Sequence, residues 1–250
     1  MHIVAIIPSH GLSDLLYKCL EHLFMSEMRH ELSACVIDNG TPDLSVHDVC
    51  CKEQPWSDQM FYVRLPWNSH FARACNTGIH VVGQADAFLF LNNDCFIEPD
   101  CLSKMASALT SGKGDIIGAK LLYPDGTIQH AGGMIQGNWQ GVSHEHRGLS
   151  GDDPLVMASR EVSWVTGACM LVRAKEFVRN EGFYEGFENG YEDVDLCLRF
   201  KEAGLKVYYC ADAVGTHLEA QTVGRKDKEG DNAKMFFNVW TKRDVNKFKP

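Results

Sequence analysis

Short apolar runs alternate with helix-like segments through the first hundred residues, and this alternation constrains the fold more than any other feature. Four runs have the length and composition of buried strands: residues 3–7, 33–37, 60–65 and 87–91. Two segments between them, residues 12–28 and 71–82, repeat apolar side chains with helical spacing. Strands separated by helices indicate right-handed βαβ units, so we predict an α/β fold with a mostly parallel sheet flanked by helices.

The second half of the chain has a more mixed pattern, in which glycine is frequent from residue 116 onwards. Pro124-Asp125-Gly126 predicts a turn between two strands, and residues 138–159 predict a mobile loop. The segments that follow are predicted as a strand, a helix, an amphipathic helix and a closing strand, at residues 162–172, 174–180, 193–203 and 206–210. No repeat or linker divides the sequence, which predicts a single domain over residues 1–250.

The composition is that of a globular protein whose main partner is not nucleic acid. The net charge is −9, whereas a phosphate backbone selects a basic surface. The ten cysteines form no CxxC pair and mostly stand alone in apolar segments, which predicts reduced core thiols in a cytoplasmic protein; the adjacent Cys50 and Cys51 are expected in a loop. The first apolar run is too short for a signal peptide, and no segment approaches the roughly 20 apolar residues of a membrane span.

Polar side chains follow three of the predicted strands, at Ser9-His10, Asp38-Asn39 and Asn92-Asn93-Asp94. In open parallel sheets ligands bind beyond the carboxyl ends of the strands, so these side chains are expected on one rim. Divalent Mg²⁺ and Mn²⁺ prefer oxygen ligands and often take one or two protein carboxylates together with substrate phosphate oxygens. The alternative is a set of ordinary turns, because Asn and Asp favour turns.

An acidic cluster stands just before the amphipathic segment near residue 193. Glu192 and Asp193 could serve as a carboxylate general base or could simply complement the dipole at the start of a helix. Asp195 lies four residues before Arg199, a spacing that predicts an intrahelical ion pair with a structural role.

Other candidates are single polar residues, each of which has a structural alternative. His217 follows a short strand and could complete a coordination sphere begun by Asp94, although a lone histidine is more often structural. Arg225 could pair with a diphosphate, and Arg73 and Asn76 could reach the same rim, where Arg73 could equally be a surface charge.

Together these segments resemble the family 2 inverting glycosyltransferases with the GT-A fold, over nearly the whole chain. The resemblance rests on the order and spacing of IIPSH, VIDNG, NSHFARACNTG, FLFLNND, VTGACMLVR, GYEDVDLCLR and the loop around His217. It is nearest to the rhamnosyltransferase-like branch, which builds bacterial cell-surface polysaccharide. The resemblance implies a nucleotide-binding sheet with a small mixed sheet on the acceptor side. It implies a nucleotide-sugar half at 1–115, an acceptor and catalytic half at 116–225, and a C-terminal helix and basic tail at 226–250.

The resemblance also implies a role for each matching residue. Asn92-Asn93-Asp94 stands where the family has its DxD motif, with Asp94 and His217 as ligands of a divalent metal, Mn²⁺ or Mg²⁺. Asp193, in the pair with Glu192, matches the catalytic base. The residues implied to bind the nucleotide sugar are Pro8, Ser9, His10, Asp38, Arg73, Asn76, Asn92 and Asn93; those implied to border the acceptor are Trp164, Gly167, Ala168 and Cys169.

Two positions depart from the family pattern. Asn92 replaces the first Asp of the DxD motif, which removes a charge and puts the ribose contact of that position in doubt. His70 replaces a glycine in the NxGFAxAxN segment, where a side chain could narrow the pocket. Neither change removes the implied metal ligand or base.

The function expected from the resemblance is inverting transfer of a sugar from a dTDP- or UDP-sugar, such as dTDP-rhamnose, to a glycan or lipid-linked acceptor hydroxyl. The rivals are a non-catalytic sugar-nucleotide-binding protein of the same fold and a sugar nucleotidyltransferase. The latter is disfavoured because IIPSHGLSDLL has one glycine and no basic residue. The basic residues 242–249 could rest peripherally on a membrane surface or could form a solvated tail. We favour the solvated tail. A homodimer, formed through residues 233–240, is also left open.

Overall fold

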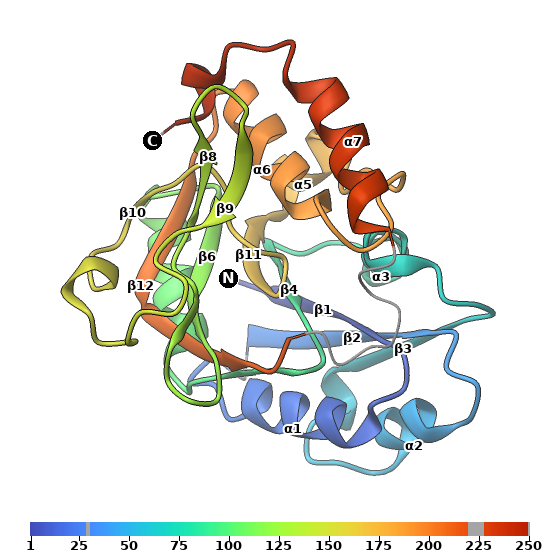
Figure 1. Cartoon of the computed structure of the whole chain (residues 1–250). Helices are drawn as coiled ribbons and strands as arrows, with labels where there is room; N and C mark the ends of the chain where they lie inside the picture. The colour runs from blue at the N-terminus through green and yellow to red at the C-terminus, as the bar shows by residue number, and fades with distance from the viewer. Residues whose placement is uncertain (29–30, 220–227, 250) are drawn as a thin grey trace.

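The computed structural model describes residues 1–28, 31–219 and 228–249 and has the predicted α/β architecture (Figure 1). Its strands are β1 (Ile3–Ser9), β2 (Leu32–Asn39), β3 (Met60–Leu65), β4 (Ala87–Leu91), β5 (Cys95–Ile97), β6 (Ile116–Leu122), β7 (Ile128–His130), β8 (Gly133–Gln136), β9 (Gly141–His144), β10 (Arg160–Glu161), β11 (Cys169–Arg173) and β12 (Val207–His217). Its helices are α1 (Ser13–Phe24), α2 (Ser45–Cys51), α3 (His70–Val82), α4 (Cys101–Thr110), α5 (Ala174–Arg179), α6 (Glu192–Glu202) and α7 (Glu229–Trp240), with 3₁₀ turns η2 (Ser57–Gln59), η3 (Pro154–Val156) and η4 (Val245–Phe248).

One sheet runs through the molecule and joins both halves of the chain. Its strand order is β10-β12-β6-β11-β4-β1-β2-β3, with β5 attached to β12 and β7 attached to β6. Strands β1, β2, β3 and β4 are parallel, and β12 is parallel to β6. The antiparallel members are β11, which lies between β4 and β6, and the short β5, β7 and β10. Beside this sheet, β8 and β9 form a small antiparallel pair. The predicted fold class is therefore confirmed.

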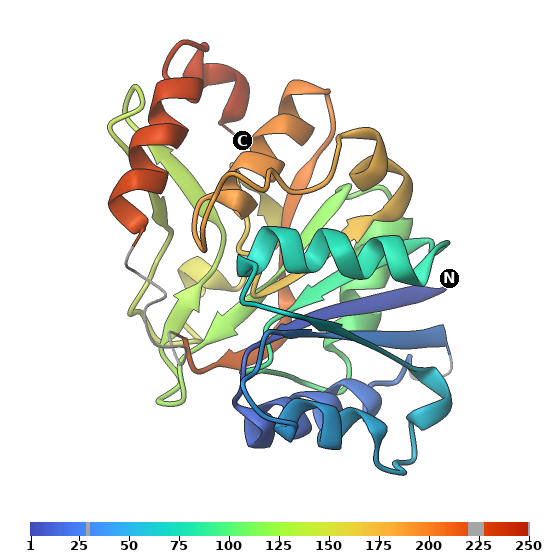
Figure 2. The same cartoon turned by 90° about the vertical axis from the view of Figure 1, so that its right-hand side faces the viewer.

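The sheet separates two apolar cores. Strand β1 shows why the sequences of the sheet's strands are continuous apolar runs. Successive side chains of a strand point to opposite faces. Val4 and Ile6 accordingly pack in the core with α3, α5, α6 and α7, whereas Ile3, Ala5 and Ile7 pack in the core with α1, α2 and α4. Both faces are covered, so every position must be apolar. In Figure 2, α3 lies on one side of β1 and β2, and α1 and α2 lie on the other.

Several predicted elements match the structure closely. The strands predicted at 60–65 and 87–91 coincide with β3 and β4, and the turn at Pro124-Asp125-Gly126 joins β6 to β7. All ten cysteines, which fall within the described residues, are free, and all except Cys51 are buried. No helix in the described ranges is long and apolar enough to cross a membrane.

Other predictions of local structure were wrong. Cys50 and Cys51 end α2 and do not lie in a loop. Residues 138–159 were predicted as a loop but contain β9 and η3. Val142 and Val156 in these two elements pack with the core on the side of α6 and α7. The strand expected at 162–172 is confined to β11, since the preceding residues leave the sheet and approach β8 through the bridge between Trp164 and Gly133.

Candidate active site

A hollow lies beyond the carboxyl ends of β1, β2 and β4, where the polar residues that follow these strands converge. We call it the first hollow. Its polar lining comes from loops after the parallel strands and from the start of α6, as expected for a ligand site in an open α/β sheet. The lining residues are Pro8, Ser9, His10, Asn39, Asn68, Phe71, Asn92, Asn93, Asp94, Thr166, Gly167, Ala168, Asn189, Glu192 and Asp193.

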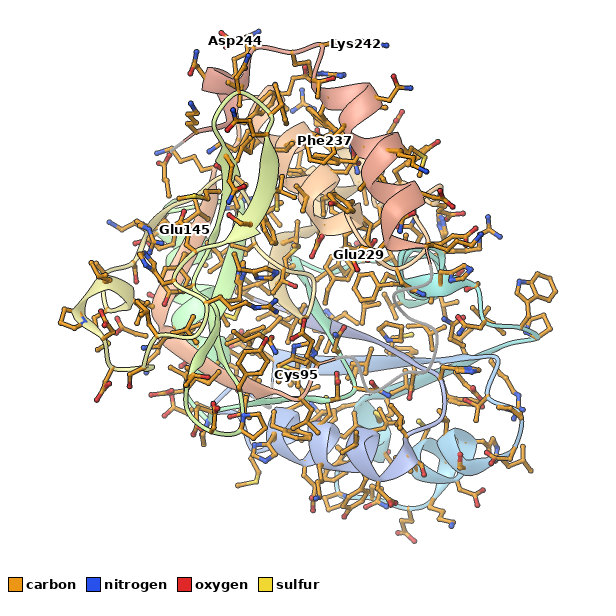
Figure 3. All side chains as sticks on the ribbon, in the orientation of Figure 1. Cys95, Glu145, Glu229, Phe237, Lys242 and Asp244 are labelled. Carbon is orange, nitrogen blue, oxygen red and sulfur yellow. The ribbon has the colours of Figure 1, made fainter. Side chains whose placement is uncertain are left out.

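Asp94, which lines this hollow, contacts His217, which lines a neighbouring hollow described below. Strand β5 pairs with β12 in a register that sets His217 opposite Cys95, the neighbour of Asp94. As a result His217 Nε2 lies 3.1 Å from Asp94 Oδ1, although the residues are 123 positions apart. Both side chains are buried, at 3% and 7% exposure. Figure 3 labels Cys95, which lies deep inside the molecule between the two layers of helices.

Two amides surround this pair. Asn92 Nδ2 is 3.1 Å from His217 Nε2, and Gln129 Oε1 is 2.6 Å from His217 Nδ1. Asn93 faces the other way and donates from Nδ2 to Ser9 Oγ at 2.8 Å, which ties the end of β4 to the end of β1. The three residues after β4 therefore contact both the His217 region and the loop after β1.

The spacing of Asp94 and His217 fits two neighbouring ligands of a hard divalent ion. Two neighbouring ligands of an octahedral ion with bonds of about 2.1 Å lie about 3.0 Å apart, close to the observed 3.1 Å between Asp94 Oδ1 and His217 Nε2. In the part of the chain that the structure describes, no cluster of three or more His, Cys, Asp or Glu side chains could hold a metal. Ions such as Mg²⁺ usually complete their shell with water and substrate phosphate oxygens, so two protein ligands suffice.

Asp193 lies in the first turn of α6 at the wall of the hollow. Its Oδ2 accepts from the backbone N–H of Gly167 at 3.0 Å, and its Oδ1 accepts from the N–H of Val194 at 2.8 Å. These bonds fix the carboxylate toward the segment before β11. The residue before the helix, Tyr191, has φ of 74°, and Asn189 has φ of 60°, so the loop that delivers Asp193 is held in an uncommon conformation.

Asp195 has the structural role predicted for it. Its Oδ2 accepts from Arg199 Nε at 2.8 Å, and its Oδ1 accepts from Trp240 Nε1 at 3.0 Å. Arg199 also donates to the carbonyl oxygen of Gly182 at 2.7 Å. This network joins α6 to α7 and to the loop after α5.

A second hollow adjoins the first on the other side of Asp193. Thr166, Asn189 and Asp193 line both hollows. Glu229, labelled in Figure 3 at the start of α7, lines the far side of the second hollow. Its remaining lining residues are Gln129, Val142, His144, Arg147, Trp164, Gly190, Tyr191, Val194, His217 and Glu219. Asp193 thus stands at the boundary between two sites, which is where a group acting on two substrates would have to lie.

A buried histidine supports the wall between the hollows. His130 is fully buried, and its Nε2 accepts from the N–H of Thr166 at 3.3 Å. The proton of the neutral ring is therefore on Nδ1, which lies 2.8 Å from His144 Nδ1. Burial lowers the pKa of His130 well below its usual range, and the nearby His144 lowers it further. His130 is thus a neutral hydrogen-bonding support.

Several residues expected at the nucleotide site lie elsewhere. Asp38 is fully buried and does not line the first hollow; its carboxylate accepts from the Thr41 N–H at 3.0 Å and from the Tyr62 hydroxyl at 2.8 Å. Side chains alternate along β2, so its neighbour Asn39 faces the hollow instead.

Cys169, expected to border the acceptor, is in the core within β11 and lines neither hollow.

Arg73 and Asn76 lie on α3, away from both hollows. Arg73 Nε pairs with Glu185 at 3.0 Å on the surface. Asn76 Nδ2 donates to the Phe183 carbonyl oxygen at 2.9 Å, and its Oδ1 accepts from the Phe183 N–H at 3.1 Å. Both side chains therefore hold the loop that follows α5. Arg225 falls outside the described residues.

Sequence reasoning placed Asn39 on the rim but missed other lining residues, chiefly Asn68, Asn189 and Gln129. Asn189 donates toward His70 Nδ1 at 3.1 Å and accepts from the Phe71 N–H at 3.0 Å, which fastens the loop before Asp193 to the start of α3. The Asn189-Gly190 pair is a turn signal that pointed to this loop. Gln129 gave no such local signal, because its partner is 88 positions away.

The sheet order, the polar rim and the small second sheet define a GT-A glycosyltransferase fold. Residues 4–164 match the profile of glycosyl transferase family 2. This chain belongs to that family.

Similar proteins agree with this assignment. O-antigen biosynthesis protein RfbC of Myxococcus xanthus is 27% identical over 223 residues, which are 86% of this chain and 17% of that protein. The N-acetylglucosaminyl-diphospho-decaprenol L-rhamnosyltransferase of Mycobacterium tuberculosis is 38% identical over 68 residues, 27% of this chain and 22% of that protein. The chain thus spans only a small part of these relatives. A crystal structure of GalNAc-T7 with UDP, GalNAc and Mn²⁺ has the same fold, with a TM-score of 0.73 at 13% identity, over 96% of this chain and 48% of that one.

Proposed function

We propose that this chain transfers a sugar from a nucleotide-diphosphate donor in the first hollow to an acceptor hydroxyl in the second hollow, with inversion at the anomeric carbon. The observation that carries the proposal is the position of Asp193, which lines both hollows. In a single displacement the acceptor oxygen attacks from the face opposite the leaving diphosphate. A base between the two sites can take the acceptor's proton as that oxygen attacks.

Asp193 acts as the general base in this proposal. Its hydrogen bonds from the N–H groups of Gly167 and Val194 fix the direction of the carboxylate before substrate binds. Such fixed orientation lowers the cost of reaching the reactive geometry. Glu192 lies beside it, and its Oε2 accepts from the N–H of Gly190, so we assign Glu192 to shaping the loop that carries the base.

Asp94 and His217 would hold a divalent metal, Mn²⁺ or Mg²⁺. The metal would neutralise charge that develops on the leaving diphosphate. The mixed donor set of one carboxylate and one imidazole suits such an ion and leaves most of its coordination sphere to phosphate oxygens and water. Mn²⁺ in the GalNAc-T7 structure supports this choice for the shared fold.

The donor is proposed to be a dTDP- or UDP-sugar, with dTDP-rhamnose as the first candidate. The name of the mycobacterial relative supports rhamnose and a lipid-linked acceptor. We assign the nucleotide contacts to residues that line the first hollow, among them Ser9, His10 and Asn39. We propose that the chain forms one catalytic domain. Contact between the basic residues 242–249 and a membrane remains a prediction, as does dimerisation.

A thermal-shift panel tests the donor assignment. UDP, dTDP, GDP and CDP are each added with and without Mn²⁺, because a ligand that binds the folded state raises apparent stability by mass action. At a hundredfold excess over Kd the gain is about 2.7 kcal/mol. For a chain of this length that gain corresponds to a rise in Tm of about 5–10 °C. A metal-dependent rise with one nucleotide is expected; no rise with any of them contradicts the proposal.

A further inference from the structure

Gln129 lies on β7 and lines the second hollow, and the proposed reaction gives it no role. Its side chain is buried at 3% exposure, and β7 is held against β6 by antiparallel pairing. The carboxamide contacts a single residue twice: Nε2 donates to the carbonyl oxygen of His217 at 3.2 Å, and Oε1 is 2.6 Å from His217 Nδ1. The two polar atoms of this buried amide therefore restrain both the backbone and the imidazole ring of His217.

The first of these contacts fixes which way the amide faces. A carbonyl oxygen can only accept, so the group of Gln129 next to the His217 carbonyl must be the NH₂. The amide oxygen then faces the imidazole, and it can only accept. A flipped amide would set two oxygens against each other beside β12, an arrangement that a buried site disfavours.

The second contact fixes the proton on the imidazole ring. Because Gln129 Oε1 is an acceptor, His217 Nδ1 must carry a hydrogen. In the neutral form of the ring, which carries one N–H, Nε2 then presents a lone pair toward Asp94 and Asn92. Asn92 Nδ2, at 3.1 Å, can donate toward that lone pair, whereas Asp94 Oδ1, also at 3.1 Å, cannot.

We propose that Gln129 is a positioning residue that keeps His217 in the tautomer whose Nε2 can bind a divalent cation beside Asp94. The proposal rests on the proposed metal site and deepens it. Two acceptor atoms, Nε2 and Asp94 Oδ1, face each other in a buried place, and a cation between them removes their repulsion. Partners that orient a ligating histidine through its other nitrogen typically contribute 10–100-fold to metal affinity.

The first test reads the tautomer directly, with no metal present. Long-range ¹H–¹⁵N NMR of uniformly ¹⁵N-labelled protein at pH 8 distinguishes Nδ1–H from Nε2–H rings, and the His217 signals are assigned by their absence in His217→Gln. The wild type is expected to show the Nδ1–H form. Gln129→Leu is expected to lose this preference. The exposed Gln140→Leu is the matched control and should leave the His217 signals unchanged.

The second test measures Mn²⁺ affinity by the EPR signal of the free ion, without donor or acceptor. Gln129→Leu should bind Mn²⁺ about 10–100-fold more weakly than wild type. An Nε2–H ring in the wild type, or an unchanged tautomer and Mn²⁺ affinity in folded Gln129→Leu, would overturn the role of Gln129 alone. Failure of the wild type to bind Mn²⁺ would overturn the proposed metal site and this inference with it.

Discussion

Asp94 and His217 lie 123 positions apart in the sequence, yet Asp94 Oδ1 and His217 Nε2 are 3.1 Å apart, with Asp94 lining the first hollow and His217 lining the second. The pairing of β5 with β12 produces this contact, because it sets His217 opposite Cys95. The metal site that we propose thus depends on the pairing of two strands, with Asp94 in the short turn between β4 and β5 and His217 at the end of β12.

Asp94→Asn should remove the metal-dependent part of nucleotide binding. The neutral amide is a far poorer ligand for a hard cation than the carboxylate it replaces. In the thermal-shift panel the rise in Tm from nucleotide alone should persist, while the further rise on adding Mn²⁺ should disappear. Asp58→Asn, an exposed carboxylate in η2, serves as the control and should respond like wild type. A full Mn²⁺ response in Asp94→Asn would remove Asp94 from the metal site.

Substitutions on α3 should affect stability and not donor binding. Asn76→Ala removes both hydrogen bonds to the Phe183 backbone and should cost about 1–3 kcal/mol. Arg73→Ala breaks a surface ion pair with Glu185 and should cost less than about 1 kcal/mol. Urea denaturation measures both losses, and the Kd for the nucleotide should remain that of wild type. A tenfold rise in that Kd for either variant would favour the direct nucleotide contact that the resemblance implied.

The sequence predicted those parts of the site that depend on neighbouring residues better than those that depend on residues far apart in the chain. The strand ends at Ser9 and Asn92 were predictable, because an apolar run that stops at polar residues is a local signal. The face of an element was harder to predict: alternation along β2 turns Asp38 away from the hollow and Asn39 toward it. Gln129 could not have been found locally, since its role depends on a residue in β12.

A methyl group on Gly133 should disturb the second hollow without affecting the first. A Cβ at this position would lie 2.1 Å from Trp164 Cε2 and 2.3 Å from its Nε1, so Gly133→Ala must displace the indole. Overpacking of this kind typically costs about 1–3 kcal/mol. We expect a raised KM for the acceptor and an unchanged Kd for the nucleotide.

Gly141→Ala, in the partner strand β9, is the matched control for Gly133→Ala. Its added Cβ would meet only the end of the flexible Gln136 side chain. Acceptor KM should therefore stay near the wild-type value. An unchanged acceptor KM in Gly133→Ala, or an equal rise in both variants, would argue against an acceptor site bordered by Trp164.

His130 should make the protein less stable as the pH falls. Burial lowers its pKa in the folded state, whereas the unfolded chain takes up a proton near the usual value of about 6.5. The unfolded state therefore binds more protons below that pH, and the free energy of unfolding falls by up to about 1.4 kcal/mol per pH unit from this group. His130→Asn should lose this contribution, so its stability should change less between pH 7.5 and 5.5. The exposed His80→Asn is the control and should show the wild-type dependence, and an identical dependence in His130→Asn would contradict a neutral His130.

The most direct test of the account is the turnover of Asp193→Asn, because Asp193 is the carboxylate that lines both hollows. Asparagine keeps an oxygen that can accept from the Gly167 N–H, so folding and nucleotide binding should be preserved. We predict that kcat for sugar transfer at saturating donor falls about 10²–10⁴-fold, with an unchanged Kd for the nucleotide. The exposed Asp231→Asn should keep wild-type turnover. Near-normal kcat in Asp193→Asn would contradict its assignment as the base.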